Sequence, residues 1–181
     1  IRSSIEPLME VTQIKGDSET HPLNSPDDEF ADHEPFNIPL RWTVAMEAAW
    51  RIYQAFQSAM DSRSEEEITR GSYARSALQT GLDIEAKVGV NPYKFGMIGS
   101  TDAHTGLATV DEDNFWGKMG GSEPNPYRAS AQGYYSSSGY AAVWAEENTR
   151  EAIFAAMKRR EVYATTGPRI SLRFFAGWNF T

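Results

Sequence analysis

Residues 99–104 read GSTDAH and place a carboxylate and an imidazole two positions apart, directly after a short apolar segment. On extended backbone, residues i and i+2 project to the same side, so Asp102 and His104 can share one cation. One oxygen and one nitrogen ligand suit Zn, Mn or Fe. The same residues also fit a turn in which Asp102 caps backbone amides and His104 lies on the surface. Both interpretations stay open on the residues alone.

A second acid precedes a histidine at the same spacing, in Glu19-Thr20-His21. This segment follows a predicted strand and a Lys-Gly-Asp turn, so it too is expected near the carboxyl end of a strand, where ligands gather in α/β folds. Glu19 is therefore a weaker candidate for metal or acid–base work. His33 lies between two acids in a Pro-rich loop, and we interpret it as a solvated side chain.

The other common catalytic patterns have little support. The chain has no cysteine, and no Gly-x-Ser-x-Gly nucleophile turn occurs. The glycines of residues 117–121 do not have the spacing of a phosphate loop. Metal-activated water is therefore the better mechanism to test. Arg169 follows a Gly-Pro turn and suits either an anionic substrate or a surface salt bridge.

Composition limits the partners. The 181 residues carry 17 basic and 25 acidic side chains, a net charge of −8. Residues 16–40 hold seven of the acids and no Lys or Arg. An acidic chain without a basic patch argues against nucleic acid, and no apolar run approaches the roughly 20 residues of a membrane span.

Hydrophobic periodicity and turn residues predict the elements. Residues 41–61 predict an amphipathic helix with a buried stripe of Trp42, Met46, Ala49, Tyr53, Phe56 and Met60. The other elements are a strand at 7–14, an irregular loop at 15–40, a helix at 72–88, a strand at 94–99, a loop at 101–140, a helix from Asn148 to Arg160, and strands at 162–164 and 169–176. Helices alternating with short strands favour an α/β fold with a mostly parallel sheet.

Four segments resemble a bacterial family called domain of unknown function 3604. They are residues 13–19 (QIKGDSE), 95–104 (FGMIGSTDAH), 141–154 (AAVWAEENTREAIF) and 163–170 (YATTGPRI). That family is similar to the polymerase and histidinol phosphatase (PHP) superfamily. The resemblance implies a distorted seven-stranded α/β barrel with two or three metal ions at the strand ends. It also implies that Asp102 and His104 match the last Asp-x-His metal motif, and that the reaction is hydrolysis of a phosphate-type ester.

The chain departs from that superfamily in lacking its opening His-x-His motif. Family members are also longer, so we expect residues 1–181 to be the C-terminal part of one PHP-like hydrolase domain. The remaining metal ligands would lie in the N-terminal part of the same protein, and the fragment alone would be inactive. The expected substrate is a small anionic ester, and the compartment, periplasm or cytoplasm, stays open.

Two other functions remain possible. The first is a non-catalytic module that binds carbohydrate or protein through aromatic side chains, namely Trp116, Tyr127, Tyr134, Tyr135, Tyr140 and Trp144. The second keeps the metal site but cleaves an amide or a sulfate ester, since the same activated water serves each bond.

Overall fold

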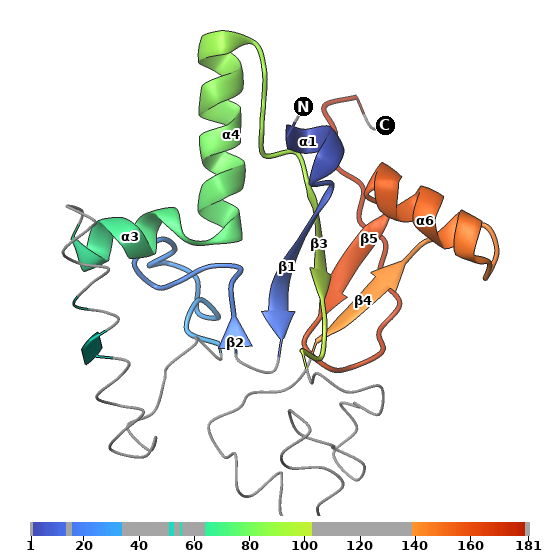
Figure 1. The fold of residues 1–181 in the computed structure, drawn as a ribbon, viewed down its shortest axis with the longest axis horizontal. Coiled ribbons are helices and arrows are strands. Elements are labelled where there is room, and N and C mark those ends of the chain that lie inside the picture. Colours follow the sequence, from blue (N-terminus) through green and yellow to red (C-terminus); the bar gives the residue numbers. More distant parts are fainter. Residues whose placement is uncertain are drawn as a thin grey trace, which may run out of the picture.

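The fold is described from a computed structural model that defines residues 2–13, 16–33, 51–52, 55, 64–102 and 139–179. Its centre is a three-stranded sheet of order β2-β1-β3 (Figure 1). Strands β1 (Leu8–Gln13) and β3 (Gly96–Gly99) are parallel, and β2 (Gly16–Asp17) returns antiparallel to β1. The register of β1 on β3 shifts between Glu10 and Thr12, which marks a β-bulge in β1.

A second sheet pairs β4 (Tyr140–Val143) antiparallel with β5 (Val162–Thr165). It packs closely against the end of β3. A Cβ atom on Gly99 would lie 2.8 Å from the Tyr140 carbonyl oxygen and 3.0 Å from that of Thr165. Glycine is therefore required for this approach, because any side chain would push the two sheets apart. In Figure 1, β1, β3 and β5 all point toward the same edge.

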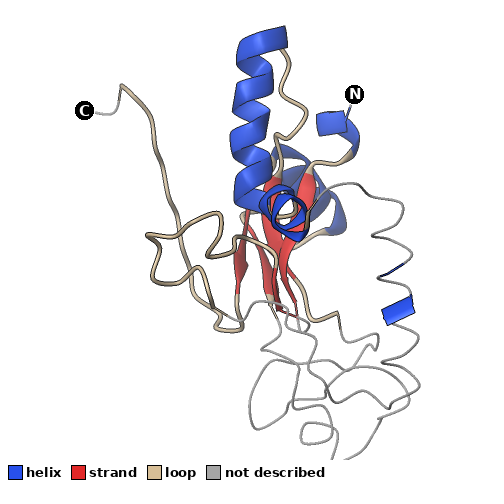
Figure 2. Cartoon of the chain, turned by 90° about the vertical axis from the view of Figure 1, so that its left-hand side faces the viewer, coloured by secondary structure: helices blue, strands red, loops and turns tan. Residues whose placement is uncertain are grey.

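The described helices are α1 (Arg2–Ile5), α3 (Glu65–Gly71), α4 (Ala74–Val88) and α6 (Arg150–Arg159). Helix α3 begins with a capping box between Ser64 and Glu67, and α4 ends at Gly89 with φ 76°. The long helix α4 rises above the strands, with its lower end near their upper ends (Figure 2). None of the helices in the described part of the chain has the length and apolarity to cross a bilayer.

Much of the local prediction is confirmed. The strands predicted at 7–14 and 94–99, the helix at 72–88 and the strand at 162–164 all form. Residues 18–33 form turns and bends, as expected for the acidic loop, and the two-residue β2 precedes them. The helix at 41–61 and the loop at 101–140 fall mostly outside the described residues; Arg51, Ile52 and Ala55 are helical.

Two local predictions are wrong. Helix α6 begins at Arg150 and not at the predicted Asn148, because Thr149 caps it with a hydroxyl that accepts the Ala152 amide. Residues 169–176 form no strand. Their backbone bonds to side chains instead: the Tyr163 hydroxyl donates to the Ile170 carbonyl oxygen at 2.6 Å, and Trp144 Nε1 donates to that of Leu172 at 3.0 Å.

The α/β class is confirmed, with strands and helices both present. The mostly parallel sheet is wrong for the described strands: β1 with β3 is parallel, whereas β1 with β2 and β4 with β5 are antiparallel. The described sheets are small and unclosed, so the seven-stranded barrel stays a prediction.

Candidate functional site

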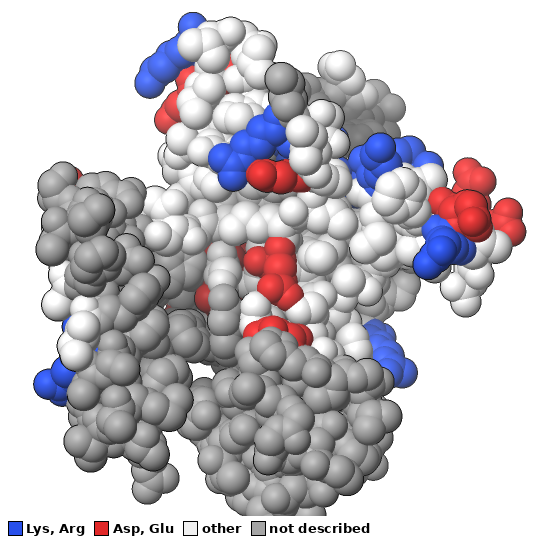
Figure 3. Space-filling view, in the orientation of Figure 1, with Lys and Arg blue, Asp and Glu red and all other residues white. Residues whose placement is uncertain are grey.

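The candidate site lies where β3 ends and the chain turns through Ser100 and Asp102. The parallel strand β1 ends at the same edge, as carboxyl ends of parallel strands do. Acidic side chains gather in the middle of the face that carries β1 and β3 (Figure 3). The contacts of Ser100, Glu10 and Asp102 determine the geometry of this turn.

Ser100 is anchored at three points. Its amide donates to the Thr12 carbonyl oxygen at 3.0 Å, and its own carbonyl oxygen accepts the Gly139 amide at 2.9 Å. Its hydroxyl donates to Glu10 Oε1 on β1. The first residue of the turn is thus tied both to the neighbouring strand and to the segment that enters β4.

Glu10 is a half-buried acid in the middle of β1 that the sequence analysis missed. Its second oxygen, Oε2, accepts a 2.7 Å hydrogen bond from Gln13 Nε2. Residues i and i+3 of a regular strand face opposite sides, so the β-bulge is what brings Gln13 beside Glu10. The signal that could have revealed Glu10 is a charged residue within an otherwise apolar strand segment, LMEV.

Asp102 has a left-handed backbone, with φ 44°, and its side chain is half-buried. Aspartate tolerates this region better than most residues, and such conformations cluster at functional sites. Projection of Asp102 and His104 to one side requires extended backbone, and the backbone of Asp102 is not extended. Its proposed partner His104 lies outside the described residues.

Glu19 lies in the loop after β2 and is bound by an arginine of α4. Arg75 Nε and Nη2 lie 2.8 and 2.7 Å from Glu19 Oε1, and Nη1 lies 2.6 Å from Asp28 Oδ2. A hydrogen bond from the Phe30 amide, together with Arg75, lowers the pKa of Asp28. The Glu19 side chain, 40% exposed, is therefore occupied by an ion-pair network.

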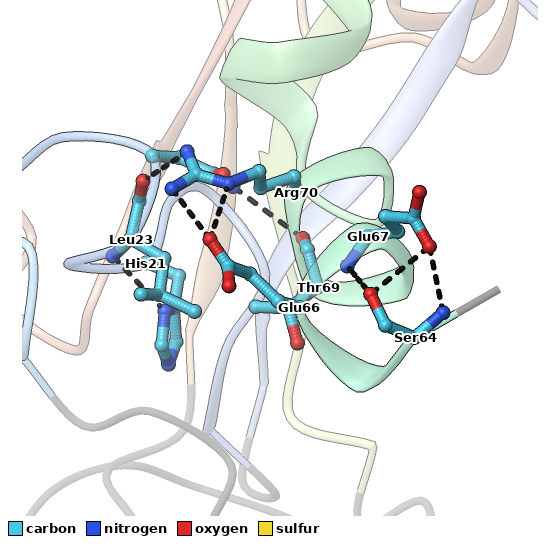
Figure 4. A network of polar contacts seen from close by, with 8 residues as sticks. His21, Leu23, Ser64, Glu66, Glu67, Thr69 and Arg70 are labelled. Carbon is cyan, nitrogen blue, oxygen red and sulfur yellow. Dashed lines mark hydrogen bonds and ion pairs between the residues drawn. The ribbon is translucent and has the colours of Figure 1, made fainter.

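The loop that carries Glu19 is also fixed by α3 (Figure 4). Arg70 donates to the Leu23 carbonyl oxygen at 2.7 Å and pairs with Glu66 at 2.9 Å. The Leu23 amide donates to His21 Nδ1 at 3.2 Å. His21 thus serves a local turn here, and its imidazole also packs 5.5 Å from the Tyr73 ring.

A cavity of about 220 Å³ lies between this loop and the segment after β5. Its polar lining includes Thr12, Asp17, Glu19 and Thr165. Burial raises the pKa of Asp17, although the amides of Glu19 and Thr20 donate to its carboxylate and oppose that rise. Asp17 therefore shapes the turn that positions Glu19.

Arg169 lies against Tyr140, at the start of β4. Its Nη2 donates to the Tyr140 hydroxyl at 3.2 Å, and its guanidinium carbon lies 5.1 Å from the centre of that ring. Because the Gly139 amide binds Ser100, Arg169 is linked to the turn through the start of β4. The Arg169 side chain is exposed.

The aromatic residues of the alternative binding module are described at two positions. Tyr140 contacts Arg169, and Trp144 packs beneath Arg173 at 4.1 Å. Trp116, Tyr127, Tyr134 and Tyr135 lie outside the described residues. The binding module stays a prediction.

The metal site stays a prediction, and the described residues can be compared with it only in part. Oxygen donors are present in Glu10 and Asp102, which suits a divalent cation. Among the described ranges, no group of three or more His, Cys, Asp or Glu side chains is placed to hold a metal ion. Asp102 fits the role of one ligand, and His104 would be the second.

A family model described as "Protein of unknown function (DUF3604)" matches residues 1–181. The chain belongs to this DUF3604 family. No curated protein and no solved structure matches it. The relation to the PHP superfamily and the bacterial origin stay predictions.

Proposed function

We propose that this DUF3604 chain contributes to a metal-dependent hydrolase of phosphate-type esters, with the reaction at the edge where β1 and β3 end. The observation that carries the proposal is the left-handed Asp102, which lies in the turn that follows a parallel strand, two positions after the anchored Ser100. Strand ends of this kind are where α/β enzymes gather catalytic groups. In this proposal the two sheets belong to a larger PHP-like barrel.

Asp102 and His104 would hold a Zn, Mn or Fe ion. When bound, the ion supplies a water of lowered pKa and polarises the phosphoryl oxygens. Arg169 would bind the non-bridging oxygens of the substrate, because a guanidinium donates paired hydrogen bonds to phosphate. Water adds to phosphorus, the bond to the ester oxygen breaks, and the alcohol leaves with a proton.

Glu19 is the weaker part of the proposal. An acid–base group needs a carboxylate that can reach the reacting oxygen, and Arg75 occupies that of Glu19. We therefore propose Asp102 as the principal carboxylate and keep Glu19 as a candidate for moving the proton.

The test uses the natural full-length protein, loaded in turn with Mn²⁺ and Zn²⁺. Bound metal is measured by elemental analysis, and turnover with chromogenic phosphomonoester, phosphodiester, sulfate and amide substrates. Asp102→Asn and His104→Ala are compared with Asp83→Asn, an exposed acid on α4. We expect phosphoester cleavage that both site variants lose and the control keeps. Turnover of the sulfate or amide alone would redirect the chemistry, and full activity in Asp102→Asn would overturn the proposal.

A further inference from the structure

Glu10 and Ser100 form a side-chain bridge between the two parallel strands, 90 positions apart in the chain. Glu10 uses both carboxylate oxygens: one accepts the Ser100 hydroxyl and the other accepts Gln13. Charged residues are uncommon in strand interiors, and a half-buried carboxylate is tolerated because its hydrogen bonds are made. The bridge therefore gives this acid a defined place and a defined partner.

The bridge lies two positions before Asp102, whose backbone is left-handed. A left-handed backbone at a residue other than glycine persists only when its surroundings hold it there. Ser100, two positions earlier, is held by Thr12 and Gly139 through its backbone and by Glu10 through its side chain. The Glu10 contact is the one that depends on side chains alone, so substitution can remove it without touching the backbone bonds.

We infer that Glu10 is a positioning residue for Asp102: its carboxylate holds the Ser100 hydroxyl and so fixes the turn that presents Asp102 to a metal ion. This inference rests on the proposed function. Gln13 completes it, because its amide sets the orientation of the Glu10 carboxylate. Residues that orient a metal ligand typically change metal affinity about 10- to 100-fold when they are replaced.

The test measures Mn²⁺ affinity of the full-length protein by calorimetry for Glu10→Ala, Ser100→Ala and the double variant. We expect each single variant to bind Mn²⁺ about 10- to 100-fold more weakly. We expect the double variant to be no weaker than either single one, since both break the same bridge. Glu10→Gln should stay within about threefold of wild type, because its amide oxygen still accepts the Ser100 hydroxyl. Glu161→Gln, which alters an exposed ion pair with Arg159 at the end of α6, is the matched control.

Two results would overturn the inference. Glu10→Gln as weak as Glu10→Ala would mean that the charge itself is needed, as in a direct ligand. Ser100→Ala with unchanged affinity would mean that the bridge does not position the site.

A second readout separates this inference from the proposed function. In the metal-free protein, amide hydrogen exchange at residues 100–102 should speed up in Glu10→Ala and Ser100→Ala and remain slow in Glu10→Gln. If wild type binds no Mn²⁺ yet shows this pattern, the proposed function fails and the positioning role of Glu10 stands. A different result would defeat the inference alone: wild type binds Mn²⁺, Asp102→Asn abolishes binding, and Glu10→Ala changes neither hydrogen exchange nor Mn²⁺ affinity.

Discussion

The turn after β3 and the loop after β2 carry the same acid-x-histidine pattern, but the surroundings of the two acids differ. Glu19 is bound by Arg75, a cation 56 positions away, which also binds Asp28. Asp102 lies two positions after Ser100, which the Thr12 carbonyl oxygen, the Gly139 amide and the Glu10 carboxylate hold in place. The comparison shows that the same spacing leads to different surroundings: an arginine binds the Glu19 carboxylate, whereas Asp102 is set apart by its left-handed backbone after an anchored residue.

The largest expected effect separates the two acids directly. Replacing Asp102 by Asn should lower kcat/KM for a phosphoester at least about 100-fold, because a charged metal ligand is lost. A working general acid or base is typically worth about 100- to 10,000-fold. Replacing Glu19 by Gln should change kcat/KM less than about tenfold, well below that range, because Arg75 already occupies the Glu19 carboxylate. Steady-state kinetics on the metal-loaded full-length protein checks both. Equal losses in the two variants would remove the distinction between the two regions.

The second-largest effect is expected on stability, where the two sheets approach closely beside Ser100. A Cβ on Gly99 would lie 2.8 Å from the Tyr140 carbonyl oxygen, whereas one on Gly71 in α3 would have nothing within 4 Å. We expect Gly99→Ala to lower the free energy of unfolding by about 1–3 kcal/mol through overpacking. Gly71→Ala should leave it unchanged or raise it by up to about 1 kcal/mol. Urea unfolding measures both, and a harmless Gly99→Ala would contradict the described packing.

The ion-pair network around Glu19 should have a smaller effect. Its side chains are 25 to 43% exposed, so water screens it. We expect Arg75→Ala to lower the free energy of unfolding by about 1 kcal/mol or less, the usual limit for such pairs. Proteolysis should also become faster within residues 18–33, which Arg75 holds to α4. Arg150→Ala, at an exposed helix start, is the control. A loss of Mn²⁺ binding in Arg75→Ala would show that the two regions are coupled.

The smallest expected effect is a pH dependence near Glu19. Burial raises the pKa of Asp17 above its ordinary value. The folded state thus holds this proton more tightly than the unfolded state, and the stability it provides is present below the unfolded pKa and lost as pH rises through the folded one. Relative to wild type, Asp17→Asn should therefore become more stable as pH rises from about 4 to 7. Thermal unfolding at several pH values checks the sign; the opposite trend would mean that the amides of Glu19 and Thr20 outweigh burial.

Local signals account for what could be predicted. Each of these signals comes from residues that are close together in the chain. The apolar segment at 94–99 contains β3, and the periodicity of 72–88 with Gly89 after it marks α4, as expected. Two further local signals were overlooked. The Ser64-x-x-Glu67 capping box marks the start of α3, and the Thr149 cap lies one residue beyond the predicted Asn148.

Long-range contacts explain the rest. Strand β4 is only four residues long, and its partner begins about twenty positions later, so its own residues give little indication of it. The Glu10–Ser100 bridge joins residues 90 positions apart, and no residue pattern predicts the bulge that brings Gln13 beside Glu10. The predicted strand at 169–176 has the right residue types but meets side chains of β5 and Trp144 in place of a partner strand.

The central claim is that Asp102 holds a divalent ion at the end of β3. Anomalous diffraction at the manganese absorption edge, from crystals of the full-length protein soaked in Mn²⁺, tests it most directly. The account predicts a peak about 2.0–2.3 Å from an Asp102 carboxylate oxygen, with a His104 nitrogen at similar distance. A peak bound elsewhere in the protein with Asp102 turned away, or no peak in crystals of active enzyme, would contradict it.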